Sequence, residues 1–306
     1  MTDPEIRSDP IHTSFSIRAR SAPRGELAVL FNGTGASPLA LTKLGERLAD
    51  IGFHVIGLRY DSGTGTRSAC PDSVATTDPD CHRAFRSEVV FGAGVVDPSG
   101  RVHDHPSANV TSADSVSNRL IKQIAHLHQR YPLNGWDSFQ RSEAGHCSEP
   151  HPVYGGCDLE WDRIVVMGHS QGAGVALYLS QFFPVARVGM LSGPADVFST
   201  PEGRVVAPWI ADGVSVTAPE DIATVTHVAD PAIWDHRAAA DALDLPGPEV
   251  STTLFPRPYL WSRQLTTALV SACPLLSGQA HNATATDLCA PSGMRDVWEY
   301  LATGEE

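Results

Sequence analysis

Residues Arg163–Ser180 read RIVVMGHSQGAGVALYLS, and this segment decides the fold. A short apolar run over residues 164–167 ends in Gly-His-Ser-Gln-Gly at 168–172, and apolar residues then recur at helical spacing. Strand, G-x-S-x-G and helix in succession form a nucleophile elbow, which exposes a serine on a strained turn above a sheet. Side chains at the two outer glycines of such a turn would collide with neighbouring backbone. The segment therefore predicts that Ser170 is a nucleophile, and the simpler alternative is a glycine-rich corner between a strand and a helix.

The sequence Gly168-His-Ser-Gln-Gly172 resembles the elbow of bacterial lipase- and esterase-like members of the α/β-hydrolase superfamily. The resemblance covers most of the chain, from about Glu26 to Leu301. It implies an α/β-hydrolase fold with a mostly parallel, doubly wound sheet, and a single domain spanning residues 1–306. It also implies cofactor-independent cleavage of carboxylic esters, with no metal ion. Haloalkane dehalogenases and epoxide hydrolases share this fold but need an aspartate at the elbow, so Ser170 excludes them.

Apolar runs that alternate with helical patterns support the same fold class. Residues 13–20 alternate between apolar and polar side chains, as in an edge strand. The expected buried strands are residues 26–31, 53–58, 164–167, 187–191, 222–229 and a last strand near 250–255. The expected helices include residues 39–51, 115–130, 232–243 and 297–301. Two insertions interrupt this alternation, at about 61–114 and 133–160, and we expect them to form a cap or rim over the site.

The loop Asn32–Pro38 follows the first buried strand. In the family that the chain resembles, this loop supplies one of the two backbone amides of the oxyanion hole. The resemblance thus implies the N–H groups of Thr34 and Gln171 as the oxyanion donors. A plain tight turn is the alternative interpretation of the loop.

A serine hydroxyl needs a general base in contact, and that base needs a carboxylate to orient it. The resemblance implies the chain order nucleophile, acid, base. His281 follows the last expected strand and is the predicted base, whereas His227 lies within a strand and His236 within a helix. Asp230 ends an expected strand and is the predicted acid, and Asp196, at the end of the preceding strand, is the alternative acid.

The six cysteines fall into three local couples, each within a loop rich in Pro, Gly or Asp. Six cysteines allow 15 pairings, so the sequence alone does not give the connectivity. No C-x-x-C spacing favours a metal site, and we therefore predict three disulfides and an oxidising compartment. The cysteines are Cys70, Cys81, Cys147, Cys157, Cys273 and Cys289.

The formal net charge of −13 argues against nucleic acid as a partner, because nucleic-acid sites are basic. No apolar stretch approaches the roughly 20 residues that cross a bilayer, so we expect no membrane span. The polar N-terminus lacks the apolar core of a signal peptide and, taken literally, indicates a cytoplasmic protein. The cysteines favour instead a secreted or periplasmic protein whose signal peptide has been removed.

A serine esterase or lipase, acting on a small-molecule or polymeric ester, is the leading hypothesis for the function. A peptidase or amidase, an acyltransferase and a polyester hydrolase would all use the same triad. A different class of protein, a non-catalytic ligand-binding protein on this fold, would not need an activated Ser170. The sequence specifies neither the acyl and alcohol parts of the substrate nor the oligomeric state.

Overall fold

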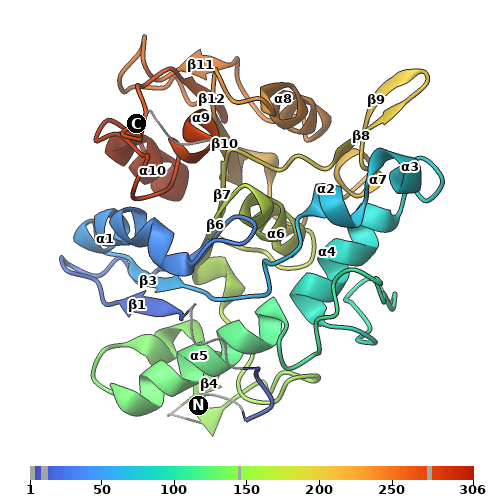
Figure 1. The fold of residues 1–306 in the computed structure, drawn as a ribbon. Coiled ribbons are helices and arrows are strands. Elements are labelled where there is room, and N and C mark those ends of the chain that lie inside the picture. The colour runs from blue at the N-terminus through green and yellow to red at the C-terminus, as the bar shows by residue number, and fades with distance from the viewer. Residues whose placement is uncertain (1–3, 8–12, 144–145, 274–277) are drawn as a thin grey trace.

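The computed structural model describes residues 4–7, 13–143, 146–273 and 278–306 (Figure 1). Its centre is an eight-stranded sheet with the order β1-β3-β2-β6-β7-β10-β12-β11. Neighbouring strands are parallel except for β1 and β3, which are antiparallel. The strands are β1 (Phe15–Ile17), β2 (Leu27–Phe31), β3 (His54–Gly57), β6 (Ile164–His169), β7 (Arg187–Leu191), β10 (Ile222–His227), β11 (Val250–Ser251) and β12 (Gln264–Thr267). The predicted fold class, a mostly parallel α/β sheet, is confirmed.

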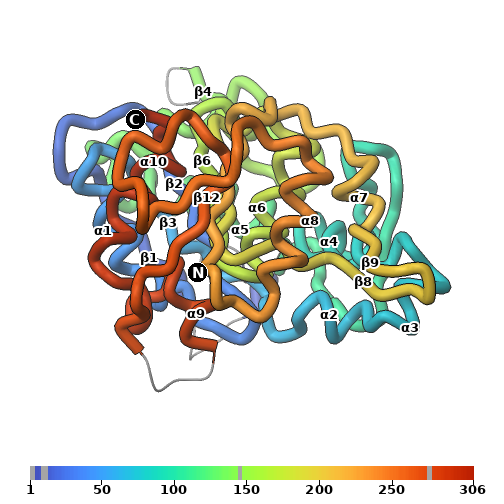
Figure 2. The backbone as a smooth tube through the Cα atoms, turned by 90° about the horizontal axis from the view of Figure 1, so that it is seen from above, coloured from blue at the N-terminus to red at the C-terminus, as the bar shows by residue number. Residues whose placement is uncertain are grey.

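Helices cover both faces of the sheet, as Figures 1 and 2 show. One face packs against α1 and α10, and the other against α4, α5, α6 and α8. Side chains alternate along a strand, so β2 sends Leu27, Val29 and Phe31 into one core and Ala28 and Leu30 into the other. This two-sided burial explains why the buried strands are continuously apolar. The helices are α1 (Thr42–Asp50), α4 (Cys81–Phe91), α5 (Val116–Arg130), α6 (Gln171–Ser180), α8 (Ile233–Ala242) and α10 (Met294–Thr303).

Two predicted elements differ from the structure. The run near 250–255 forms only the two-residue strand β11, and the last strand along the chain is β12, which the sequence pattern did not predict. The expected helix over residues 39–51 begins as a 3-10 turn at Pro38–Leu41, and α1 starts only at Thr42. Ser37 caps that turn, because its hydroxyl accepts a hydrogen bond from the Leu39 amide at 3.2 Å.

The insertion at 61–114 is more regular than its sequence indicates. It contains α4, which buries nine of its 11 residues, preceded by two single-turn helices. These are α2 (Thr66–Ala69) and α3 (Asp72–Ala75). Helix α4 packs beside α6, the helix that follows the elbow.

The insertion at 133–160 packs against the beginning of β3. The rings of Trp136 and Phe139 contact the His54 ring edge-on, at centroid distances of 4.8 and 5.3 Å. The segment also contains a small hairpin, β4 (Ser142–Glu143) with β5 (His146–Cys147), and its residues 144–145 lie outside the described residues. Because Trp136 and Phe139 are buried, they belong to the core.

The three predicted cysteine couples are disulfides: Cys70–Cys81, Cys147–Cys157 and Cys273–Cys289. Each bridge closes a loop of 10 to 16 residues, so each fixes a local segment rather than joining distant parts of the chain. Among the described residues, no helix combines the length and apolar character that a bilayer crossing requires. The expectation about the N-terminus falls partly on residues 1–3 and 8–12, which lie outside the described residues.

Candidate active site

Ser170 lies at a strained turn between β6 and α6. Its φ of 57° and ψ of −118° are unusual for a residue with a side chain. A Cβ atom at Gly168 would lie 2.0 Å from the Gly172 carbonyl oxygen, and one at Gly172 would lie 2.3 Å from the Phe31 carbonyl oxygen. Both glycines are therefore required by close backbone contacts, for the reason expected from the sequence.

Asp230 and His281 are joined by a hydrogen bond. Asp230 lies three residues beyond β10, and His281 belongs to the short helix α9 (Gln279–Asn282), which follows β12. The Nδ1 atom of His281 is 2.8 Å from Oδ2 of Asp230, and the other carboxylate oxygen accepts a hydrogen bond from the Ala232 amide at 2.9 Å. Burial alone would raise the pKa of Asp230, but the hydrogen bond and charge of His281 hold it below the usual value.

His169 connects Ser170 to the His281 loop. Its Nε2 atom donates to the His281 carbonyl oxygen at 3.1 Å, and the two imidazole rings are 4.9 Å apart between centroids. Since His169 directly precedes Ser170, this contact brings the elbow and the His281 loop together. Among the described residues, no hydrogen bond joins the Ser170 hydroxyl to His281. Catalytic contacts are often long in unliganded sites and shorten when substrate binds.

Among the described residues, neither of the two alternative histidines is hydrogen-bonded to a carboxylate. His227 is bonded to the Leu269 carbonyl oxygen at 3.1 Å. His236 lies beside Asp230. Its Nδ1 atom is 3.9 Å from Oδ2 of Asp230 and 3.3 Å from the Thr226 hydroxyl. Burial is the main cause that lowers the pKa of His236 to about 4, so this ring is neutral at neutral pH.

In the part of the chain that the structure describes, two groups of side chains have the composition of metal ligands. One is Asp230, His236 and His281, whose ligand atoms lie within 4.8 Å of one another. The other is Cys70, Cys81 and His105, but the two sulfur atoms are bonded to each other and offer no thiolate.

The alternative acid, Asp196, forms a buried ion pair with Arg86 of α4. Nη2 of Arg86 is 2.7 Å from one carboxylate oxygen, and Nε is 3.0 Å from the other. The Trp209 indole also donates to this carboxylate, at 3.0 Å. Burial alone would raise the pKa of Asp196, but Arg86 holds it below the usual value. Within the described part of the chain, no hydrogen bond connects Asp196 to a histidine.

We expect Arg86→Met to destabilise the protein by about 3–5 kcal/mol, because it leaves Asp196 buried without its counter-ion. The side chains of the pair are only 1% and 0% exposed. Urea unfolding followed by circular dichroism would measure the loss. The matched control is Arg20→Met, which breaks exposed pairs with Glu46 and Asp50 and should cost less than about 1 kcal/mol. Equal losses in the two variants would contradict the structural role of Arg86.

The two predicted oxyanion residues are in contact. The Thr34 hydroxyl donates to Oε1 of Gln171 at 2.8 Å. Gln171 is the first residue of α6, so its amide has no acceptor within the helix. Its carbonyl oxygen accepts a hydrogen bond from Nη1 of Arg86 at 2.7 Å, which ties the first turn of α6 to α4.

A cavity of about 190 Å³ opens beside Ser170. Ten of the described residues line it, among them Ser170, Gln171, Thr34, Thr66, Arg67 and Arg86, and the other four are glycine, serine or alanine. No residue of 133–160 is among the ten. Two larger cavities, of about 380 and 420 Å³, do not include Ser170.

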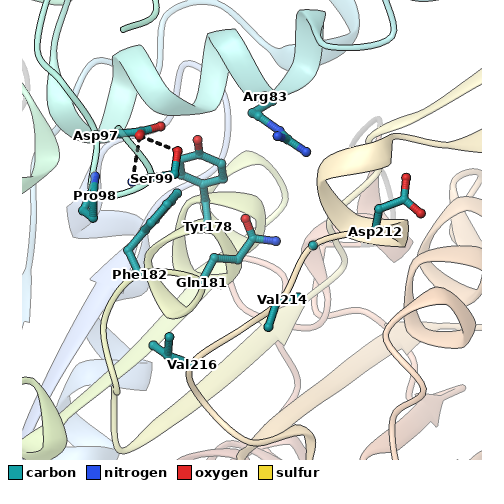
Figure 3. A pocket seen from close by; sticks show the side chains of 11 residues that line it. Arg83, Asp97, Pro98, Ser99, Tyr178, Gln181, Phe182, Asp212, Val214 and Val216 are labelled. Carbon is teal, nitrogen blue, oxygen red and sulfur yellow. Dashed lines mark hydrogen bonds between the residues drawn. The ribbon is translucent and has the colours of Figure 1, made fainter. Parts of the chain in front are cut away.

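The 380 Å³ cavity lies at the other end of α6, where Tyr178 and Phe182 line it (Figure 3). Arg83 of α4 and Asp212 also border it, as Figure 3 shows. Ser170 is at the beginning of α6 and these residues are at its end, so this cavity is separate from the elbow. The small cavity at the elbow is therefore the candidate active site.

Acidification should destabilise the fold through buried histidines. Burial is the first cause that lowers the pKa of His169 to about 3 and that of His236 to about 4, against about 6.5 in an unfolded chain. The unfolded state then binds more protons below pH 6.5, so the free energy of unfolding falls as the pH falls. We expect a loss of roughly 1–2 kcal/mol per histidine between pH 6.5 and 5. In His236→Gln, urea titrations should show a shallower dependence on pH, and an unchanged dependence would contradict this explanation.

Sequence reasoning missed the arginines of this site. Arg67 and Arg86 lie in the insertion at 61–114, where no motif marks them. The only signal was the disulfide couple Cys70 and Cys81, which indicated an ordered loop.

No family model and no curated protein matches this sequence. The structure is similar to that of the esterase PE8, with 18% identity over 76% of this chain and 84% of that chain and a TM-score of 0.37. It is also similar to esterase 2 from Thermogutta terrifontis, with 14% identity, 94% and 85% coverage and a TM-score of 0.42. A carboxylesterase from Bacillus cereus has 11% identity, 85% and 84% coverage and a TM-score of 0.34. The chain's own mostly parallel sheet, with helices on both faces and a strand–serine–helix elbow, is that of the α/β-hydrolase fold.

Proposed function

We propose that the protein is a serine hydrolase that cleaves carboxylic esters through an acyl-enzyme on Ser170. The observation that carries this proposal is the 2.8 Å hydrogen bond between Asp230 and His281. His169, which precedes Ser170, binds the His281 carbonyl oxygen and so holds His281 near the elbow. The strained backbone of Ser170 supports it, because such strain at a functional turn exposes a nucleophile.

In the proposed mechanism, the Ser170 oxygen attacks the ester carbonyl carbon while Nε2 of His281 accepts the hydroxyl proton. Asp230 accepts a hydrogen bond from Nδ1 of His281 and balances the imidazolium charge. The tetrahedral intermediate collapses, the C–O bond to the alcohol breaks, and His281 returns the proton to the departing alcohol. Water, deprotonated by the same base, then releases the carboxylic acid and restores Ser170.

We assign the oxyanion hole to the backbone amides of Gln171 and Thr34. The Gln171 amide lies at the positive end of the α6 dipole, next to the nucleophile. The hydrogen bond from the Thr34 hydroxyl to the Gln171 side chain supports a position of the Asn32–Pro38 loop beside the elbow. Each such donor contributes about 2.7–4 kcal/mol to lowering the barrier.

Of the two insertions, we assign the role of a rim to 61–114. This segment contributes Gly65, Thr66, Arg67 and Arg86 to the lining of the cavity. We also propose that the protein acts in an oxidising compartment outside the cytoplasm, because three disulfides require such conditions to persist.

The test of the proposed function is turnover of a short ester, p-nitrophenyl acetate, by the full chain and by the variant Ser170→Ala. The parent protein should release p-nitrophenolate above the rate in buffer, and the variant should not. A folded parent protein without turnover would contradict the proposal.

A further inference from the structure

The lining of the Ser170 cavity is positively charged in a strongly acidic protein. The chain has a net charge of −13, yet the ten described residues that line the cavity include two arginines and no aspartate or glutamate. Among the lining residues that the structure describes, none is a leucine, isoleucine, valine, methionine or aromatic residue. Ligand pockets are usually lined mainly by apolar and aromatic side chains. This lining therefore suits a small polar group better than a fatty acyl chain.

The charge of one of these arginines is already compensated. Arg86 is fully buried, and its guanidinium is bonded to both oxygens of Asp196 and to the Gln171 carbonyl oxygen. This guanidinium stabilises the fold and has little capacity left for a ligand.

Arg67 is different, because it shares a single carboxylate with another arginine. Its Nη2 atom is 2.6 Å from Oδ2 of Asp235, and Arg204 of the hairpin β8 (Val197–Thr200) and β9 (Gly203–Val206) binds the other oxygen of Asp235. Two guanidinium groups around one carboxylate leave an excess of positive charge. The side chain of Arg67 is 64% exposed, so a ligand in the cavity can reach it.

The side-chain amide of Gln171 is a further hydrogen-bond donor at the cavity. Gln171 is 4% exposed, and the Thr34 hydroxyl occupies its side-chain oxygen. Its Nε2 atom is buried and makes no hydrogen bond to the described residues. A buried donor without an acceptor is costly, and a ligand oxygen would remove that cost.

The segment that carries Arg67 is held in place. Arg67 lies in α2, and the next residue after that helix, Cys70, is bonded to Cys81 at the beginning of α4. Thr66 of the same helix is 3.4 Å from Nη2 of Arg86. The disulfide therefore fixes the position of Arg67 in α2 relative to Arg86, the residue of α4 that lines the cavity.

We propose that the substrate is a small ester that carries a negative charge, of which the half-ester of a short dicarboxylic acid is the simplest example. Its free carboxylate binds the Arg67 guanidinium and Nε2 of Gln171, while its ester carbonyl lies at Ser170. Guanidinium groups match carboxylates in geometry and form charge-assisted hydrogen bonds with them. This inference rests on the proposed ester hydrolysis at Ser170.

The test compares monomethyl succinate with methyl butyrate, which have the same acyl length and differ in the terminal carboxylate. A pH-stat follows acid release by the full chain, and the readout is the ratio of kcat/KM for the charged ester to that for the neutral one. We expect the parent protein to favour the charged ester at least about tenfold. Arg67→Gln should lower the ratio roughly 10- to 100-fold, and Arg67→Lys should lower it less.

The matched control is Arg237→Gln, which removes an arginine that pairs with Glu249 and does not line the cavity. It should keep the parent's ratio. The inference would be overturned by a ratio near one in the parent, or by a ratio that Arg67→Gln leaves unchanged. In either case, Ser170-dependent hydrolysis of methyl butyrate would still support the proposed function. Absence of hydrolysis of both esters, with Ser170 unreactive towards a fluorophosphonate, would overturn both.

Discussion

Ser170→Ala should remove ester hydrolysis, lowering kcat by a factor on the order of 10⁶, as loss of the nucleophile does in subtilisin. The methyl side chain has no oxygen to form the acyl-enzyme. Release of p-nitrophenolate from p-nitrophenyl acetate measures the loss, and circular dichroism checks that the variant is folded. Replacing serine with alanine at this half-buried position removes one oxygen and leaves both flanking glycines in place, so the fold should be retained.

Ser180→Ala is the matched control for this substitution. Ser180 ends the same helix, α6, and its hydroxyl is bonded to the Leu177 carbonyl oxygen within that helix. This variant should retain the parent's turnover. Turnover by Ser170→Ala at the parent's rate would show that another group performs the reaction.

Asp230→Asn should lower kcat by about 10⁴, as the equivalent change does in a serine protease triad. The substitution keeps the size of the side chain, but the amide cannot replace the carboxylate as the charged acceptor of the His281 Nδ1 proton. The imidazole then adopts the wrong tautomer, and the positive charge that develops on it during the reaction has no counter-charge. Single-turnover kinetics with p-nitrophenyl acetate would separate this chemical defect from weaker binding.

Asp196→Asn distinguishes the two candidate acids. The carboxylate of Asp196 compensates Arg86, so its neutralisation should mainly reduce the stability of the fold. The active fraction of each variant, counted by fluorophosphonate titration, allows kcat to be compared per folded molecule. A larger loss of kcat in Asp196→Asn than in Asp230→Asn would contradict the assignment of Asp230 as the acid.

The elbow was predictable because its determinants are local. Gly168 and Gly172 are required by backbone contacts within the turn and with β2, and the flanking runs have the periodicity of a strand and a helix. Asp230 and His281 were found through chain order, and the structure brings them within hydrogen-bonding distance. Their catalytic roles stay predictions.

The arginines of the cavity were not predictable, because their partners are distant in sequence. Arg86 is separated from Asp196 by 110 residues, and Arg67 from Asp235 by 168. Helix α4 has no simple apolar stripe, since it buries Arg86 and Glu88 together with its hydrophobic residues. A sequence pattern detects amphipathic helices well, but a helix buried on most sides with internal ion pairs lacks that signal.

Strand β12 was missed for a related reason. Its four residues, Gln264–Thr267, contain a single aliphatic side chain, so no apolar run marks it. The strand exists because it pairs in parallel with both β10 and β11. Tertiary pairing, rather than local propensity, determines it.

An activated Ser170 should react with a fluorophosphonate. Treatment of the unreduced full chain with such a reagent, followed by intact-mass measurement and peptide mapping, tests whether it does. We expect one adduct per chain, located on Ser170 and absent from Ser170→Ala. A folded protein that takes up no adduct, or takes it up at another residue, would show that Ser170 is not the activated nucleophile.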